Sequence, residues 1–370
     1  MINEDEQLKY RIALTLVPGI GSVVAKNLVS YCGSVEHVFR RKKHQLEKIP
    51  GIGAERADAI MNHKVFNRAE EEVLFVRKHK IKTCFYLDAD YPARLKNCDD
   101  APVLLFLKGA VDLNASRIIS IVGTRNSTGY GKHVTELLID GFSKYNATIV
   151  SGLAYGIDII AHKEALKNKL PTIGVLAHGL DRIYPSAHKP VAEKMVRNGG
   201  VLTEFISKTN PDRENFPSRN RVVAGMTDAT IVVESATKGG ALITADIANS
   251  YNRDVFAVPG KIGEKFSEGC HELIRLNKAM LVESADQVAE MLNWNEKGSA
   301  KQENKQLKFF HELKPDEKIL VSILQQNGKT DIDTITIQSK MAMSKVSSTL
   351  LNLEFAGVLR SLPGKVYELV

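Results

Sequence analysis

The sequence predicts an α/β fold. A Rossmann-like, doubly wound and mostly parallel sheet is expected between an all-α helix-hairpin-helix domain at the N-terminus and a winged-helix domain at the C-terminus. Three patterns predict it: a Pro-Gly-Ile-Gly turn that occurs twice near the start, apolar runs that alternate with helical stretches through the middle, and three helical stretches followed by a hairpin at the end. A length of 370 residues allows two or three domains of ordinary size.

The composition is that of a globular chain, with 44% hydrophobic and 25% charged residues, and it excludes the disordered and collagen-like classes. No apolar run approaches the roughly 18 residues that a membrane helix needs, and the acidic N-terminus lacks the basic region of a signal peptide. The four cysteines form no CxxC pair. We therefore expect reduced thiols, a cytoplasmic location, no membrane contact, no metal site and no cofactor.

The net charge of +7 is concentrated at the two ends of the chain. Residues 1–82 hold 15 Lys and Arg against 10 Asp and Glu, residues 83–295 hold 24 of each kind, and residues 296–370 hold 11 against 9. A basic excess favours a nucleic-acid partner. Any polyanion site in the neutral middle must therefore be a local cluster of cations.

The N-terminal domain, residues 1–82, contains an internal repeat. Val-Pro-Gly-Ile-Gly at 17–21 returns as Ile-Pro-Gly-Ile-Gly at 49–53, and helical stretches follow at 22–30 and 54–62. This pattern is typical of a helix-hairpin-helix pair, whose glycines let the backbone approach a phosphate at the start of a helix. The alternative is a helical bundle whose turns need glycine only for packing. The candidate phosphate contacts are Gly19, Gly21, Gly51 and Gly53.

The central domain, residues 83–292, alternates short apolar runs with helical stretches. The predicted strands are 117–122, 147–151, 172–176, 201–205, 229–234 and 255–258. The predicted helices are 132–144, 157–168, 187–198 and 241–251. Nearly continuous apolar strands separated by helices indicate a parallel sheet that is covered on both faces. Ligands of such sheets bind at the carboxyl ends of the strands, so the loops after the strands are the candidate sites.

Glycine-containing loops follow the first two predicted strands. The first loop is not a Walker loop, but it places Arg125 directly after Gly123 and Thr124, which suits a phosphate. The second loop begins with Ser151 and Gly152, and its glycines are again expected to bring the backbone close to a ligand. An ordinary strand-to-helix turn is the alternative for both loops.

Two further features belong to the same sheet edge. Lys238, Gly239 and Gly240 precede another helix and are further candidate phosphate contacts. Asp158 and His162 stand one helical turn apart, which suits an acid–base pair or, more commonly, a buried hydrogen bond. No GxSxG elbow, HExxH motif or Cys–His pair occurs. We therefore expect no catalytic residue.

The segment 213–221 places three arginines and one aromatic residue in nine positions of an otherwise neutral domain. Arginine binds two phosphate oxygens at once, and Phe216 offers a face on which any base can stack. Ser218 is expected to cap a helix that begins at Arg219. This combination suits single-stranded nucleic acid. The alternative is a set of internal salt bridges around a core phenylalanine.

The C-terminal part predicts a linker at 293–306, polar with one aromatic residue, and a winged-helix domain at 307–370. Its expected elements are helices at 316–326, 333–339 and 344–355, a stop at Gly357, and a hairpin of 358–361 and 366–369 around Pro363 and Gly364. The third helix carries one basic residue, Lys345, and one acid, Glu354. A helix with so little positive charge is poorly suited to DNA. Contact with a protein is therefore at least as well supported as contact with DNA.

Six separated motifs, in this order, resemble the DNA-processing protein DprA (Smf) family. They are YPARL at 91–95, IVGTR at 121–125, IVSGLAYGID at 149–158, GLDRIYP at 179–185, FPSRNR at 216–221 and VFAVPG at 255–260. They span the central domain, and both flanking domains resemble additions that some members of the family carry. The chain departs from the family pattern after Tyr184 and Pro185, where Ser186, Ala187 and His188 replace a stretch that usually holds an asparagine.

The resemblance implies a non-enzymatic protein that binds single-stranded DNA during natural transformation, protects it and helps load the RecA recombinase onto it. It also implies a homodimer formed through the central domain. Carried over residue by residue, the implied DNA-binding set is Gly123, Thr124, Arg125, Ser151, Gly152, Arg213, Phe216, Ser218, Arg219, Asn220 and Arg221.

The alternative function is that of a Rossmann-like enzyme that binds nucleotides or hydrolyses nucleoside monophosphates. Phosphoribohydrolases of similar fold carry a PGGxGTxxE motif, whose glutamate acts on the ribose. The comparable stretch here, 238–243, lacks the proline, the third glycine and the glutamate. Its composition argues against hydrolysis.

Overall fold

The computed structural model describes residues 3–294, 314–356, 358–362 and 365–369. The chain divides into two compact units, Met1–Asn295 and Glu296–Val370. Most of the predicted linker, residues 295–306, lies outside the described residues, and so do Gly357, Pro363 and Gly364. In the described residues, no helix is both long enough and apolar enough to cross a membrane.

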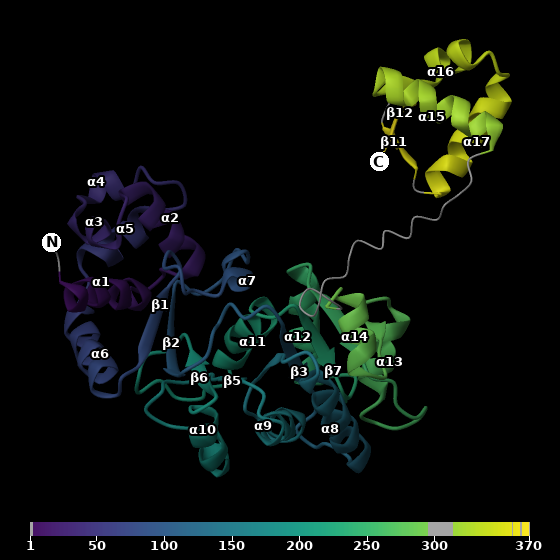
Figure 1. Ribbon diagram of the computed structural model, residues 1–370. Helices are drawn as coiled ribbons and strands as arrows, with labels where there is room; N and C mark the ends of the chain where they lie inside the picture. The colour runs from purple at the N-terminus through teal and green to yellow at the C-terminus, as the bar shows by residue number, and fades with distance from the viewer. Residues whose placement is uncertain (1–2, 295–313, 357, 363–364, 370) are drawn as a thin grey trace. The chain divides into compact units, whose positions relative to one another are not determined.

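A nine-stranded sheet forms the centre of the first unit, in the order β1-β2-β6-β5-β4-β3-β7-β8-β9 (Figure 1). Its strands are β1 (Lys82–Phe85), β2 (Leu104–Gly109), β3 (Ile118–Val122), β4 (Thr148–Ser151), β5 (Thr172–Val175), β6 (Gly199–Thr203), β7 (Ala229–Val232), β8 (Asp254–Ala257) and β9 (Met280–Leu281). The strands from β6 to β9 pair in parallel, as predicted. The antiparallel edge of β1 and β2 was not expected from the sequence.

Helices cover both faces of this sheet. They are α7 (Ala93–Lys96), α8 (Gly129–Ser143), α9 (Ile157–Lys167), α10 (Lys189–Met195), α11 (Asn215–Gly225), α12 (Gly240–Ser250), α13 (Glu268–Arg275) and α14 (Ala285–Met291), with a short 3-10 helix at Ser186–His188. One apolar core joins the sheet to α7, α11, α12 and α13, and another joins it to α8, α9 and α14. The wholly buried strands β3 to β7 explain the continuous apolar runs of the sequence.

Trp294 belongs to this second core, although it was placed in the linker predicted at 293–306. It is only 8% exposed, and its ring centre lies 6.2 Å from those of Phe142 and Tyr145. Arg117 also donates a hydrogen bond of 2.9 Å to the Trp294 carbonyl. The indole is buried because α8 supplies an apolar surface for it, which the polar residues around it in the sequence do not reveal.

The strand order contains a switch point between β3 and β7. From β3 the chain moves outward through β4 and β5 to β6, returns to β7 on the other side of β3, and continues to β9. The loops after β3 and β7 therefore leave in opposite directions from neighbouring carboxyl ends. Such a point leaves a crevice in which doubly wound proteins bind their ligands.

The N-terminal helices are α1 (Glu4–Leu16), α2 (Ser22–Cys32), α3 (Val35–Arg40), α4 (Lys43–Leu46), α5 (Ala54–Met61) and α6 (Phe66–Lys78). Both repeats adopt the same turn. Gly19 and Gly51 have φ of 77° and 80°, values that favour glycine, while Gly21 and Gly53 are the N-caps of α2 and α5. The helical core continues into β1 and β2 through Phe85 and neighbouring apolar residues, so these helices and the sheet share one compact unit.

The second unit is a winged-helix domain. Its elements are α15 (Pro315–Asn327), β10 (Thr330–Asp331), α16 (Ile332–Ser339), α17 (Met343–Phe355), β11 (Leu359–Leu362) and β12 (Val366–Leu369). The strands form a sheet in the order β10-β12-β11, of which β10 was not expected from the sequence. Lys345 on α17 forms an ion pair of 2.7 Å with Asp316.

Candidate nucleic-acid interface

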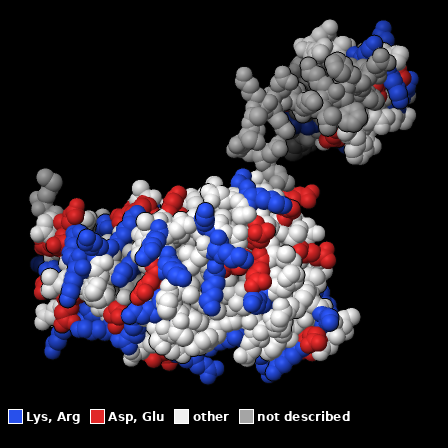
Figure 2. Space-filling view, turned by 60° about the horizontal axis from the view of Figure 1, so that its bottom comes forward, with Lys and Arg blue, Asp and Glu red and all other residues white. Residues whose placement is uncertain are grey.

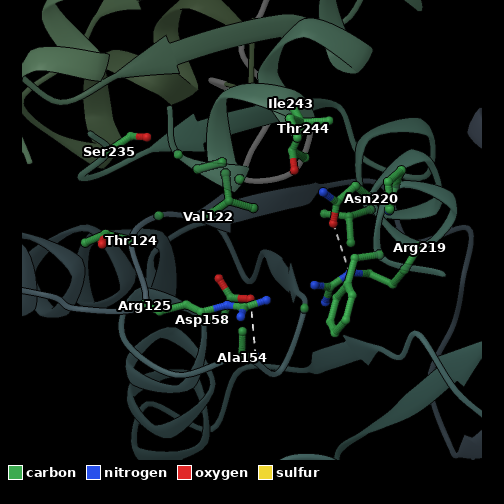
Figure 3. A pocket seen from close by; sticks show the side chains of 18 of the residues that line it. Val122, Thr124, Arg125, Ala154, Asp158, Arg219, Asn220, Ser235, Ile243 and Thr244 are labelled. Carbon is green, nitrogen blue, oxygen red and sulfur yellow. Dashed lines mark hydrogen bonds between the residues drawn. The ribbon is translucent and has the colours of Figure 1, made fainter. Parts of the chain in front are cut away.

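A cavity of about 350 Å³ lies at the switch point of the sheet. Its walls come from the loops after β3, β4 and β7 and from the first turns of α11 and α12, which are the loops singled out from the sequence (Figure 3). Nine predicted site residues line it: Gly123, Thr124, Arg125, Gly152, Phe216, Arg219, Asn220, Gly239 and Gly240. Five predicted residues of the central domain do not: Ser151, Arg213, Ser218, Arg221 and Lys238.

Two guanidinium groups flank the aromatic ring of Phe216. The Arg125 Cζ lies 5.4 Å from the ring centre and the Arg219 Cζ lies 5.8 Å from it, within the range of cation–π attraction. In Figure 3, Arg125 enters the cavity from one side and Arg219 from the other. Arg125 is exposed and has no carboxylate partner in the part of the chain that the structure describes. Its charge is therefore available to a ligand.

Arg219, in contrast, is buried and held by internal bonds. Its Nη1 donates to the Val175 carbonyl at 3.0 Å, and its Nε donates to Asn220 Oδ1 at 3.0 Å. Burial lowers the pKa of Arg219, while the nearby carboxylate of Asp158 opposes this shift. The pKa of Asp158 is raised by burial, with the charge of Arg219 acting against it. Beneath the cavity, Asp158 and Arg219 therefore each stabilise the charged form of the other.

The glycines of these loops make room for other parts of the protein. A Cβ on Gly152 would lie 1.6 Å from Nη1 of Arg219, and one on Gly123 would lie 2.5 Å from Ile157 Cγ1. Gly156 has φ of 76° and would meet the Thr124 carbonyl. Close approach to a ligand was the expected reason for these glycines, but internal contacts already require them. Gly240 differs, because nothing lies within 4 Å of a Cβ built there.

Glu234, which was not singled out from the sequence, holds the Arg125 loop. Its carboxylate accepts from the Thr128 amide at 2.9 Å and from the Thr128 hydroxyl at 2.5 Å, and its own carbonyl accepts from the Thr124 amide at 2.7 Å. Thr128 caps α8, which therefore begins at Gly129, three residues before the predicted start. The sequence signal that could have indicated this structural role is an acidic residue that closely follows a buried strand.

Several predicted site residues point elsewhere. The Ser151 hydroxyl donates to the Ile121 carbonyl at 2.6 Å inside the sheet. Ser218 lies within α11, which begins at Asn215, so the expected cap at Ser218 and helix start at Arg219 are wrong. Arg213 is exposed just before α11, and Lys238 lines a neighbouring hollow of about 320 Å³.

Arg221 faces the N-terminal helices. It pairs with Glu204 and donates to the Asp100 carbonyl, and it lines a groove that the first helix-hairpin-helix turn borders through Gly21. Both side chains of the pair are 14% exposed. The geometry of Arg221 therefore fits the alternative interpretation of the segment, in which the arginine forms an internal salt bridge.

Asp158 and His162 do not form a hydrogen bond with each other. The His162 ring donates through Nδ1 to the Thr172 hydroxyl at 2.7 Å, because that hydroxyl already donates to the Ile149 carbonyl. Burial lowers the pKa of His162 to about 3, which keeps the ring neutral. The geometry fits a buried structural histidine and offers no acid–base pair.

Comparison with known proteins matches each part of the chain. The family model for DNA recombination-mediator protein A matches residues 82–293, that for a SAM-like helix-hairpin-helix tandem matches 12–63, and that for the DprA winged helix domain matches 311–365. Protein Smf of Synechocystis is 30% identical, with 97% of this chain and 98% of that protein covered. The DNA processing protein DprA of Streptococcus pneumoniae is 37% identical, with 66% of this chain and 86% of that protein covered.

Solved structures agree with these matches. The crystal structure of DprA from Streptococcus pneumoniae superposes with a TM-score of 0.64 at 33% identity and covers 76% of this chain and 97% of that one. DNA processing protein A from Helicobacter pylori, described with its single-stranded DNA binding mode, gives a TM-score of 0.53 at 30% identity over 58% of this chain and 96% of that one. The chain is therefore a member of the DprA (Smf) family of DNA processing proteins, with helix-hairpin-helix and winged-helix domains on either side of the family's central domain.

Proposed function

We propose that this protein binds single-stranded DNA, without choice of sequence, in the cavity at the switch point of the sheet. The observation that carries the proposal is the exposed Arg125 guanidinium, without a carboxylate partner among the described residues, beside the half-buried ring of Phe216 on the cavity wall. A guanidinium binds the phosphate and an aromatic ring stacks with any base. The relative from Helicobacter pylori, whose single-stranded DNA binding mode has been described, supports the same ligand here.

The charge distribution supports a local site over a broad basic tract. Figure 2 shows Lys and Arg spread over one face with Asp and Glu between them, in keeping with the neutral balance of residues 83–295. Around the cavity, Arg125 and Arg213 are exposed and neither has a carboxylate partner among the described residues. We assign both to phosphate contact, with Arg219 as the buried base of the site.

We further propose that the protein acts in the cytoplasm during natural transformation, protecting incoming DNA and helping to load RecA. Its relatives are named DNA processing proteins, and its family model is named for a recombination mediator. We also propose a homodimer formed through the central domain. Exposed apolar side chains support it, among them Leu276, Met280 and Leu281 near the β9 edge. Sedimentation velocity over a concentration series tests the dimer.

A non-enzymatic role is part of the proposal. The acids and the histidine near the cavity have structural partners: Asp158 supports Arg219, His162 bonds Thr172, and Glu234 holds the Arg125 loop. The enzyme alternative predicts release of adenine from AMP. Formation of free adenine by the purified protein, lost in Asp158→Asn, would favour the enzyme.

The flanking domains receive narrower proposals. Gly21 and Gly53 are exposed at the starts of α2 and α5, and no atom lies within 4 Å of a Cβ built on either; with Gly19 and Gly51 they are proposed to contact phosphates. In the winged helix, Lys345 is paired with Asp316, while Leu351 and Phe355 of α17 are exposed. We therefore propose protein contact for that helix.

The decisive experiment compares single-stranded and double-stranded oligonucleotides of equal length at two salt concentrations, with fluorescence anisotropy as the readout. The proposal predicts tighter binding of the single strand at both concentrations and equal affinity for different base compositions. Equal affinity for the two forms would contradict it.

A further inference from the structure

A second, narrower pocket adjoins the switch-point cavity. It is bordered by two tyrosines that lie within the sequence motifs but belong neither to the predicted site residues nor to the proposed phosphate contacts. It shares Arg125, Gly152, Ala154, Phe216 and Arg219 with the main cavity. Its remaining lining residues include Tyr155, from the loop after β4, and Tyr184, from the loop before the 3-10 helix. Phe216 thus borders the main cavity on one side and the tyrosine pocket on the other.

Both tyrosines are half exposed although they carry large aromatic rings. Each retains 51% of its accessible surface. Among the described residues of the first unit, only four tyrosines are exposed, and two of them border this one pocket: Tyr155 and Tyr184. Exposed rings gathered beside a binding cavity are a feature that folding alone does not require.

The Tyr155 ring is held in position by a neighbouring ring. The Tyr155 ring packs at 70° against the ring of His188, with 4.8 Å between the ring centres. His188 is itself buried and donates through Nδ1 to the Leu153 carbonyl at 2.8 Å.

Tyr184 is anchored through its backbone. Its amide donates to Nε2 of the buried His178 at 3.2 Å, and Nδ1 of that ring donates to the Gly179 carbonyl at 2.9 Å. This pair of bonds requires the neutral ring, and burial lowers the pKa of His178 accordingly. A side chain that is already positioned, as the Tyr155 ring is, loses less freedom when a base stacks on it.

The size of the pocket decides how a base would use it. The space between the side chains is about 30 Å³, room for one water molecule, so a base cannot enter. The usable surface is the exposed part of the two rings at the mouth of the pocket. A strand whose phosphate lies on Arg125 and whose base lies on Phe216 would bring the next bases over this mouth.

We propose that Tyr155 and Tyr184 form a second stacking platform, which continues the single-stranded DNA path from Phe216 along the sheet edge, with His188 as the positioning residue of Tyr155. The ligand is an unpaired nucleobase of either class, because stacking needs only a π-face. This inference rests on the proposed function and extends it from a single aromatic contact to a path several nucleotides long.

The test replaces each ring by an aliphatic side chain of similar bulk. Tyr155→Leu and Tyr184→Leu are each expected to weaken binding of a 20-nucleotide dT strand by about 5- to 100-fold, with an unchanged dependence on salt because no phosphate contact is lost. Tyr155→Phe should bind like the parent, since stacking does not need the hydroxyl. The matched control is Tyr31→Leu, a tyrosine of α2 that is 57% exposed and remote from the pocket.

A second measurement locates the contact directly. In strands with single 5-iodouracil substitutions, ultraviolet cross-links are expected at Tyr155 or Tyr184 as well as at Phe216, one or more nucleotides apart. His188→Ala should weaken binding and reduce the Tyr155 cross-link while leaving the one at Phe216. Cross-links at Phe216 alone, with parental affinity in both Leu variants, would overturn the platform and leave the proposed function standing. No binding by the parent protein would refute the proposed function itself.

Discussion

Arg125 and Arg221 provide the sharpest test of the proposed site, because the structure gives two arginines of the predicted set opposite surroundings. Arg125 is exposed, touches Phe216 and has no carboxylate partner among the described residues. Arg221 is paired with Glu204 and bonded to the Asp100 carbonyl. Alanine at Arg125 should therefore affect DNA, and alanine at Arg221 should affect folding.

The expected magnitude for Arg125→Ala follows from a single charge-assisted contact. Such a contact contributes about 1.5–3 kcal/mol, which is roughly one to two decades in affinity for a single strand. The slope of log affinity against log salt should fall by about 0.7 for each lost phosphate contact. The Tm should stay within about 1 °C of the parent, because among the described residues the exposed side chain makes no ion pair and its one ring contact is with Phe216.

Arg221→Ala should behave in the opposite way. Removing one partner of a pair that is 14% exposed on each side leaves the Glu204 carboxylate buried, at a cost of about 3 kcal/mol or more. In a unit of this size the Tm should fall by roughly 5–10 °C. Burial already raises the pKa of Glu204 to about 7, so the carboxyl can take up a proton, and the fall should be smaller at pH 6 than at pH 8.

Anisotropy titrations with a labelled 20-nucleotide strand, and scanning fluorimetry of the same samples, measure both effects. Phe216→Ala completes the comparison, since it should weaken binding with a nearly unchanged salt slope. The reasoning fails if Arg125→Ala binds like the parent while melting several degrees lower. That result would make Arg125 a structural residue and remove the phosphate role from its loop.

Four further predictions use other parts of the structure. Gly152→Ala should lower both Tm and DNA affinity, because its Cβ would displace the Arg219 guanidinium, whereas Gly240→Ala, where the space is open, should leave Tm unchanged. The double variant Gly21→Asp with Gly53→Asp should keep or raise Tm, because aspartate caps helices well. It should weaken DNA binding several-fold if the two turns contact phosphates, whereas an unchanged affinity would make the turns packing units. Because of His162, the free energy of unfolding of the parent should fall below pH 6.5 by up to about 1.4 kcal/mol per pH unit. The cause is that the unfolded ring binds a proton that the folded ring, with its pKa lowered to about 3, does not. Unfolding titrations at pH 7 and pH 5 should show a smaller loss for His162→Asn, and equal losses in the two proteins would count against this account. Truncation after residue 295 removes a separate unit and should leave DNA affinity within about threefold, while a large loss with unchanged oligomeric state would assign α17 to DNA.

The parallel sheet and its loops could be predicted from the sequence because the physics is local. Wholly buried strands read as apolar runs, and parallel strands place their following loops at one edge. The antiparallel β1 and β2 were missed because an apolar run does not reveal its pairing partner or direction. Trp294 was missed for a related reason, since its apolar surroundings come from α8, about 150 residues earlier.

The roles of single arginines could not be predicted in the same way. Arg219 and Arg221 are two residues apart on α11, and successive residues of an α-helix are rotated by about 100°, so the two side chains leave the helix on nearly opposite sides. One reaches the cavity and the other the groove beside Gly21. The sequence segment suggested one cluster of cations because its three arginines fall within nine positions. Closeness in sequence does not reveal the directions in which a helix sends its side chains.

Glycine at a sheet edge has two explanations that a sequence cannot separate: approach of a ligand or approach of another part of the protein. At Gly152 the second holds, because a Cβ would overlap the Arg219 guanidinium. Yet Arg219 reaches the cavity only because that space is empty, and the ring of Phe216 lies 5.8 Å from its Cζ. If DNA binds in the cavity as proposed, the missing Cβ therefore affects binding through the position of the Arg219 guanidinium and not through contact between the backbone and the ligand. It follows that Gly152→Ala and Arg219→Ala should not have additive effects on DNA affinity, since both remove the same guanidinium from the cavity.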